Sequence, residues 1–116
     1  MRLQTKTIVV LGMHRSGTSM IGGILNRLGV NMGRDLIGME YSNPLGHFED
    51  KEFVLLNNEI LSSAGGSWDS PPPYENILKQ KEKYEERIMK LVRDKQFKIW
   101  GWKDPRTSLT IELFLP

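Results

Sequence analysis

A short apolar run followed by two spaced glycines constrains the fold of this chain more than any other feature of its sequence. Residues 8–11 are Ile-Val-Val-Leu, and the next eight are Gly12-Met-His-Arg-Ser-Gly17-Thr-Ser. Four residues between the glycines let the main chain curl around an anion with its N–H groups pointing inward. A helix that begins directly afterwards adds about half a positive charge at its N-terminus. The pattern predicts a strand, a phosphate-binding turn and a helix, in that order.

The spacing G-x-x-x-x-G-x-[ST] differs from that of a nucleotide-binding P-loop at one position. Thr18 stands where such a loop carries the lysine that reaches the β- and γ-phosphates. Arg15, inside the loop, offers a forked cation instead. Either glycine alone is better explained as a plain strand-to-helix turn, but its combination with Arg15, Thr18 and Ser19 favours an anion site. The turn therefore predicts binding of a phosphate or phosphosulfate group rather than ordinary ATP chemistry.

Composition indicates one folded domain and is compatible with an anionic small-molecule ligand. The chain has 116 residues, of which 39% are hydrophobic and 26% charged, an ordinary globular balance. A net charge of +2 with interspersed signs predicts neither a nucleic-acid nor a membrane partner. Zero cysteines and two scattered histidines predict no disulfide and no metal site. The longest apolar run near the start is too short for a signal or a membrane span, so we expect a cytoplasmic protein. The oligomeric state is left open.

Periodicity predicts an α/β fold with parallel strands and flanking helices, a doubly wound sheet. Strands are expected at 5–11 and 97–102, and helices at 18–28, 51–63, 75–95 and 107–115. The first strand is nearly all apolar, as in a parallel strand covered on both faces. Residues 33–46 are expected to form an extended surface connection, and 67–74, with three prolines, a rigid bridge. Because ligands collect at the carboxyl ends of strands, the glycine turn and the cluster from Lys103 to Arg106 should face one crevice.

Three segments in this order resemble the sulfotransferase family. They are residues 12–19, then Asn43-Pro-Leu-Gly-His-Phe-Glu-Asp50, then Gly101-Trp-Lys-Asp-Pro-Arg-Thr107. The resemblance covers essentially the whole chain and identifies residues 1–116 as the N-terminal part of a single sulfotransferase domain. It implies a P-loop-like fold that binds 3′-phosphoadenosine 5′-phosphosulfate (PAPS) and transfers its sulfuryl group to a hydroxyl or amine. Carbohydrate, lipid, small metabolite and peptide acceptors all remain open.

The resemblance also implies roles for individual residues. Lys103 would stabilise the charge that develops during transfer, and Arg106 would hold its loop or contact the sulfuryl group. Arg15 would neutralise the leaving oxygen, and no metal is required. The residues implied to bind the 5′-phosphosulfate are Arg15, Ser16, Gly17, Thr18 and Ser19.

A catalytic base must take the proton of the acceptor, and the family uses histidine or glutamate for this step. Glu49 is the first choice here, with His47 and Asp50 as alternatives. An acidic residue at this place also suits the start of a helix, so capping of a helix over 51–63 explains Asp50 equally well.

One motif of the family has no counterpart in this chain. An arginine after a later strand, followed about two helical turns on by a serine, grips the 3′-phosphate in the family. Arg34 and Ser42 have a similar gap in the wrong context, and Arg106 and Ser108 are too close together. We therefore expect a truncated domain with little activity of its own.

Two other interpretations stay open. In a P-loop kinase or nucleotidase, Asp104 would end a Walker-B-like strand and bind magnesium, although Thr18 and Pro105 argue against this. In a non-catalytic protein, the chain would be a fold remnant or a subunit that binds a partner.

Overall fold

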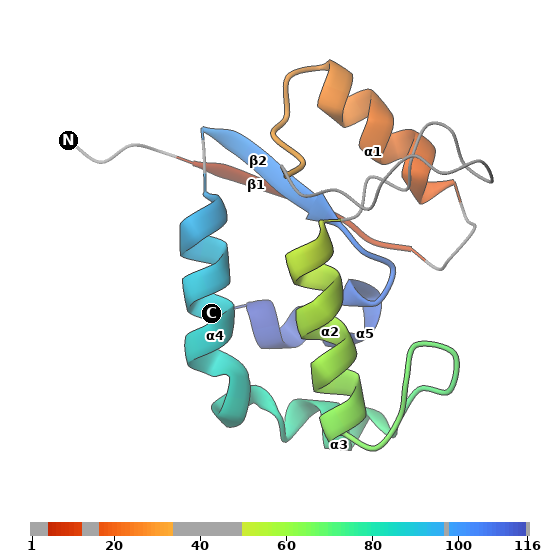
Figure 1. The fold of residues 1–116 in the computed structure, drawn as a ribbon. Helices are drawn as coiled ribbons and strands as arrows, with labels where there is room; N and C mark the ends of the chain where they lie inside the picture. The colour runs from red at the N-terminus through yellow and green to blue at the C-terminus, as the bar shows by residue number, and fades with distance from the viewer. Residues whose placement is uncertain (1–4, 13–16, 34–49, 97, 116) are drawn as a thin grey trace.

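The computed structural model describes residues 5–12, 17–33, 50–96 and 98–115, and every structural statement below concerns those residues. Within them the chain is mixed α/β, with five helices and a two-stranded parallel sheet (Figure 1). The elements in chain order are β1 (Lys6–Val10), α1 (Thr18–Arg27), α2 (Lys51–Ser63), α3 (Tyr74–Leu78), α4 (Lys81–Lys95), β2 (Ile99–Lys103) and α5 (Thr107–Phe114).

The parallel sheet brings two distant segments to the same edge. β1 pairs with β2 in a register that runs from Lys6 opposite Ile99 to Val10 opposite Lys103. β2 also forms a single parallel bridge to Asn31, whose N–H donates to the Ile99 carbonyl at 3.0 Å. Both strands therefore end at one edge, as the sequence predicts for the glycine turn and the Lys103 cluster.

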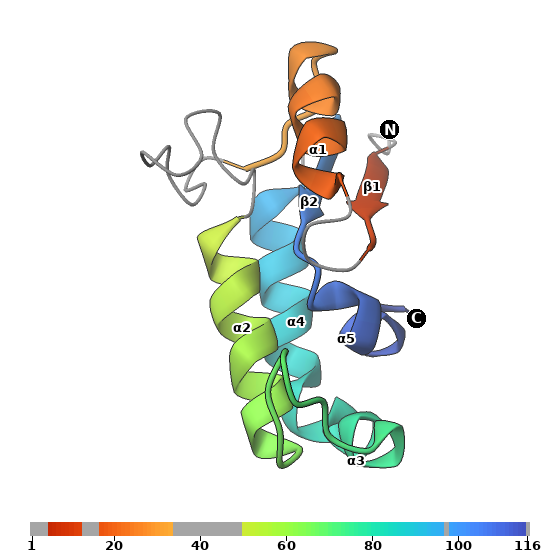
Figure 2. The ribbon, with the colours of Figure 1, turned by 90° about the vertical axis from the view of Figure 1, so that its right-hand side faces the viewer.

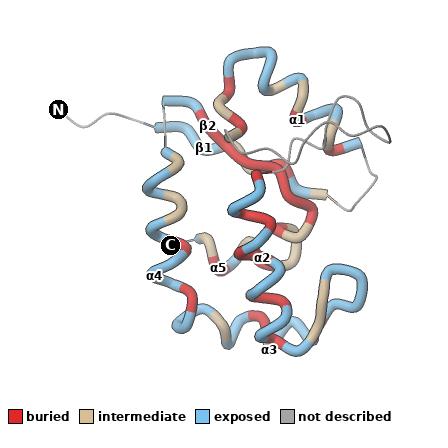
Figure 3. The backbone as a smooth tube through the Cα atoms, viewed as in Figure 1, coloured by how far each residue is buried: buried red, intermediate tan, exposed pale blue. Residues whose placement is uncertain are grey.

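Helices cover the two faces of this sheet unequally. α1 lies on one side, and α2, α4 and α5 lie on the other (Figures 1 and 2). The larger core forms between these helices, and the tube in Figure 3 shows buried positions along β2 and along α2. Its buried residues are Leu56, Ile60, Leu61, Ala64, Ile77, Tyr84, Ile88 and Leu113.

An aromatic stack joins β2 to α2. The rings of Phe53 and Trp102 lie parallel with centroids 4.2 Å apart, and Trp100 follows Trp102 at 5.6 Å. Such pairs contribute about 0.5–1.5 kcal/mol each beyond the area that they bury. The stack fixes the face of β2 that points away from α1.

Most predicted helices are confirmed to within a residue or two. The helix predicted at 51–63 is α2, whose N-cap Asp50 accepts a hydrogen bond from the N–H of Glu52 at 3.0 Å. It stops before Gly65, which has a φ of 95°. The helices predicted at 18–28 and 107–115 are α1 and α5. The connection predicted over 33–46 lies almost wholly outside the described residues.

The single helix predicted over 75–95 is wrong, because two helices occupy that range. The chain turns between Leu78 and Lys81, where the N–H of Gln80 donates to the Ile77 carbonyl at 2.9 Å. The side-chain amide of Gln80 donates to the carbonyl of Asn76 at 3.3 Å. This turn lets α3 pack against α5 while α4 runs back to the sheet (Figure 1). The helical spacing of apolar residues continues across the turn, so the sequence pattern does not predict the break.

The prediction of a first strand buried throughout is also wrong. Lys6 and Thr7 are exposed, and only Val10 is buried, whereas β2 is buried from Trp100 to Lys103. The aromatic stack and the helices behind it lie against β2, so β1 is covered well only near its carboxyl end.

Replacing Gly101 by Ala should lower the free energy of unfolding by about 2 kcal/mol. A Cβ at this position would overlap the carbonyl oxygen of Ile8 on the neighbouring strand. Urea unfolding followed by circular dichroism measures the loss. The matched control is Ile99→Val at an exposed position of the same strand, with an expected loss of about 0.5 kcal/mol or less. Equal losses for the two variants would contradict the close approach at Gly101.

Candidate functional site

The described ends of the glycine turn have the predicted order of strand, turn and helix. β1 ends at Val10, and α1 begins at Thr18. Gly17 is the N-cap of α1 with a φ of 88°, and an added Cβ would meet nothing within 4 Å. Backbone conformation rather than lack of space therefore favours glycine at this position. Arg15 and Ser16, which the sequence predicts as ligands of the anion, lie outside the described residues.

A serine on α5 forms hydrogen bonds with the first residue of this turn. The N–H of Gly12 donates to the Ser108 hydroxyl at 3.0 Å, and that hydroxyl lies 3.3 Å from the Gly12 carbonyl oxygen, to which it donates. The two residues are 96 positions apart. Sequence reasoning missed this role of Ser108, because no local pattern marks a serine whose partner is so distant in the chain.

Lys103 connects the end of β2 to the first turn of α1. Its ammonium donates to the Ser19 hydroxyl at 3.2 Å, across 84 residues of sequence, and the lysine is only 2% exposed. The first turn of α1 contains no acidic residue. A buried ammonium therefore lies at the first turn of α1, which is the positive end of that helix's dipole. The described ends of the first motif therefore contact the region of the third motif, and the predicted crevice between them stays a prediction.

Asp104, the next residue, is a structural anchor. It is fully buried, and its Oδ1 accepts hydrogen bonds from the backbone N–H and the Nη1 of Arg106 at 3.2 and 2.8 Å. Its Oδ2 accepts one from the amide of Asn57 at 2.9 Å. Arg106 also donates from Nε to Asn58 at 2.8 Å. The structure therefore gives Arg106 the first of its two predicted roles, that of holding its own loop.

Asn57 on α2 is the centre of this buried network. Besides Asp104, its amide donates to the Thr107 hydroxyl at 3.0 Å, and its carbonyl accepts from Thr110 at 2.7 Å. Thr107 also accepts a hydrogen bond from the indole of Trp102 at 3.0 Å. Sequence reasoning missed Asn57, although a polar residue within the apolar stripe of a helix is the signal that could have found it.

Asp50 combines its capping role with an ion pair. Its carboxylate lies 3.3 Å from the ammonium of Lys95 and is almost completely buried. Burial raises the pKa of Asp50 above its usual value, and the positive charge of Lys95 offsets part of that effect. The capping explanation of Asp50 is confirmed. Glu49 and His47 lie outside the described residues, so the identity of a catalytic base stays a prediction.

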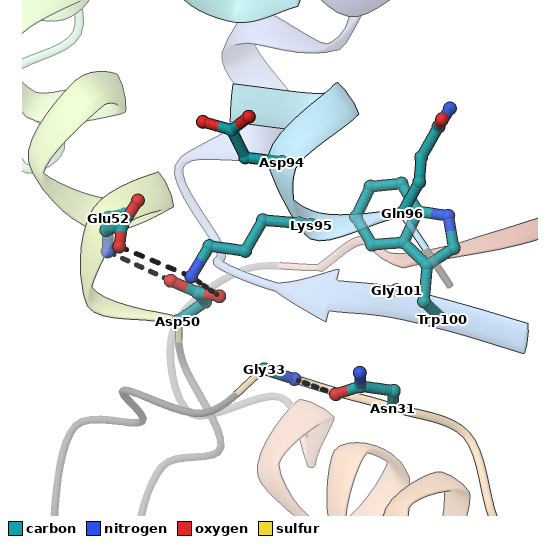
Figure 4. A pocket seen from close by; sticks show the side chains of 9 residues that line it. All are labelled: Asn31, Gly33, Asp50, Glu52, Asp94, Lys95, Gln96, Trp100 and Gly101. Carbon is teal, nitrogen blue, oxygen red and sulfur yellow. Dashed lines mark hydrogen bonds and ion pairs between the residues drawn. The ribbon is translucent and has the colours of Figure 1, made fainter. Parts of the chain in front are cut away.

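A separate hollow of about 350 Å³ lies beside Trp100 and Gly101 in the middle of β2. Figure 4 shows it between the start of α2, the end of α4 and residues 31–33, with the Lys95 ammonium between the carboxylates of Asp50 and Glu52. Its charged groups are largely paired with one another. The lining residues are Asn31, Gly33, Asp50, Glu52, Asp94, Lys95, Gln96, Trp100 and Gly101.

No protein-family model matches this chain, and no curated protein or solved structure is significantly similar to it. In the part of the chain that the structure describes, no three His, Cys, Asp or Glu side chains gather as a metal site would require. None of the helices in those segments has both the length and the apolar character needed to cross a membrane.

Replacing Asn57 by Ala should lower the free energy of unfolding by about 3 kcal/mol, because Asp104, Thr107 and Thr110 each lose a buried partner. Asn58→Ala is the control, since the neighbouring asparagine is exposed and accepts a hydrogen bond from Arg106 at the surface. Its expected loss is about 1 kcal/mol or less. Urea unfolding measures both variants, and similar losses would contradict the central position of Asn57.

Replacing Lys95 by Met should destabilise the protein in a pH-dependent way. Without the ammonium, the pKa of Asp50 in the folded state rises further above the unfolded value of about 3.8. The cost is absent at pH 3, where Asp50 is protonated in both states. The cost grows between the folded-state pKa of Asp50 in the wild type and its higher folded-state pKa in the variant. It reaches about 2 kcal/mol at pH 7.

Unfolding of this variant and the wild type at pH 3, 5 and 7 tests the linkage. Glu52→Gln removes the exposed partner of the same lysine and should cost about 0.5 kcal/mol or less. A loss for Lys95→Met that is equal at pH 3 and pH 7 would contradict the charge coupling to Asp50.

Proposed function

We propose that this chain is the donor-binding part of a sulfotransferase that uses PAPS to sulfate a hydroxyl or amine acceptor. The observation that carries the proposal is the contact of Lys103 with Ser19, which unites the end of β2 with the helix that follows the glycine turn. The resemblance of the three sequence segments to the sulfotransferase family agrees with this function. A cytoplasmic location and a small-molecule or carbohydrate acceptor belong to the same proposal.

The chemistry of transfer suits the charges at this edge. The acceptor oxygen forms a bond to sulfur while the bond from sulfur to the oxygen of the 5′-phosphate breaks, and the acceptor proton passes to a base. Negative charge then builds on the departing phosphate oxygen. In the proposed complex, the ammonium of Lys103, which contacts Ser19, and the N–H groups at the start of α1 lie beside this oxygen, because fixed donors stabilise a developing charge most effectively. Arg15 is the proposed second cation and Glu49 the proposed base.

The fold supports a P-loop-like, doubly wound arrangement. Its parallel strands end at one edge, and helices lie on both faces of the sheet. Ligands of such sheets bind beyond the carboxyl ends of the strands, where Gly12, Ser19 and Lys103 lie.

The position of Asp104 favours sulfuryl transfer over a magnesium-dependent kinase. A metal ligand at the end of a Walker-B-like strand needs a carboxylate oxygen directed to the ion. Here both oxygens of Asp104 accept hydrogen bonds, from Arg106 and Asn57, in a fully buried setting. This carboxylate stabilises its own loop through both of its oxygens.

Replacing Lys103 by Met should raise the dissociation constant for adenosine 3′,5′-bisphosphate, the desulfated product of PAPS, by about 10-fold or more. The loss follows from removing a charged donor at the 5′-phosphate. Isothermal titration calorimetry at millimolar nucleotide measures it, with circular dichroism to verify folding. Arg15→Ala is a second variant with the same expected direction.

The matched control is Lys98→Met, which removes an exposed lysine just before the other end of β2. Its dissociation constant should stay within about 2-fold of the wild type. No binding by the wild-type chain, or equal effects of the two lysine variants, would overturn the proposal.

A further inference from the structure

Trp68 differs from the other two tryptophans of the chain in being held at the surface. It is 43% exposed, whereas Trp100 and Trp102 are 1% and 2% exposed. Part of this large apolar ring is therefore accessible to a ligand, whereas the other two rings are enclosed by the core. Trp68 lies in the loop that joins α2 to α3.

That loop is rigidly built around its tip. The N–H of Ser67 donates to the Ser70 carbonyl at 3.0 Å, and the Ser67 hydroxyl donates to the Asp69 carboxylate at 2.6 Å. Gly66 approaches Ser70 and Pro72 so closely that a side chain would not fit. Consecutive prolines at 71–73 restrict the backbone further. A ring presented by a preorganised loop loses little conformational entropy when a ligand covers it.

The ring is tied to the candidate site through Arg106. The guanidinium carbon of Arg106 lies 6.0 Å from the centroid of the Trp68 ring, within the range of a cation–π contact. Arg106 in turn is fixed by Asp104 and Asn58, and it follows Lys103 by three residues. Figures 1 and 2 show the α2–α3 loop bending up toward the loop that follows β2. Trp68 therefore contacts the loop that follows the carboxyl end of β2.

The chemistry around Trp68 fits a saccharide. The residues that flank it in the loop are polar, namely Ser67, Asp69 and Ser70, and the ring contacts Arg106, which donates a hydrogen bond to Asn58. A phenol or a lipid is usually held in an apolar enclosure. A sugar ring needs one aromatic face for its C–H groups and nearby donors and acceptors for its hydroxyls.

We propose that Trp68, supported by Arg106, is a stacking platform for a carbohydrate acceptor, whose hydroxyl it presents to the anion site. The inference rests on the proposed sulfotransferase function and names its substrate class.

The indole N–H signals in a ¹H–¹⁵N spectrum of the full chain test the platform. The chain has three tryptophans, and Trp68→Phe assigns the signal of Trp68. Titration with cellotetraose, chitotetraose and trehalose should shift that signal for at least one saccharide, while the signals of the buried Trp100 and Trp102 stay in place. Titration with 4-nitrophenol is the comparison.

Binding of the shifting saccharide is then measured in variants. Trp68→Ala should raise its dissociation constant by about 10-fold, and Trp68→Phe by less, because an aromatic face remains. Met89→Ala, at an exposed apolar position on α4, should leave it within about 2-fold. A shift with 4-nitrophenol alone, no shift with any saccharide, or equal effects of Trp68→Ala and Met89→Ala would overturn the inference.

The backbone amide signals of Gly12 and Ser19 separate this inference from the proposed function. Adenosine 3′,5′-bisphosphate should shift them equally in the wild type and in Trp68→Ala. If the nucleotide shifts these signals but no saccharide moves Trp68, only the platform is wrong. If the nucleotide shifts nothing, the proposed function is wrong, whatever the saccharides do.

Discussion

The hydrogen bonds of Asn57 hold the edge of the sheet on which the candidate site depends. They join α2 to Asp104 and Thr107, which follow 47 and 50 residues later. Buried polar groups cost free energy when they lack partners, and they fix one geometry when all are satisfied. Asp104 accepts a hydrogen bond from Arg106, and Lys103 directly precedes Asp104. The direction of the chain as it leaves β2 therefore follows from one buried amide.

Because side chains alternate along β2, one face of the strand packs against the helical layer and the other face contacts α1. Trp100 and Trp102 point to the helical layer, where Trp102 stacks on Phe53. Gly101 and Lys103 belong to the opposite set, and Lys103 contacts Ser19 on α1. The apolar face secures the strand, so the other face can carry a buried ammonium. A shift of register by one residue would exchange these roles, and the aromatic stack prevents it.

Local signals made much of this arrangement predictable. Asp50 and Gly65 bound α2 because a cap and a glycine with positive φ act on their immediate neighbours. The shared edge of β1 and β2 follows from the parallel order of the strands. By contrast, Ser108 acts on Gly12 and Asn57 on Asp104 across long stretches of sequence. Contacts of that kind depend on tertiary packing, which also breaks the helix near Gln80, and no local pattern records them.

The placement of charge links the fold to the proposed chemistry. The two carboxylates that are buried in the described part of the chain lie beside cations, since Asp50 pairs with Lys95 and Asp104 with Arg106. Each pair stabilises a helix start or a loop. Lys103 donates to the neutral hydroxyl of Ser19 at the positive end of α1. A cation at the start of a helix whose first turn holds no acidic residue is the arrangement that the proposed transfer of a sulfuryl group requires.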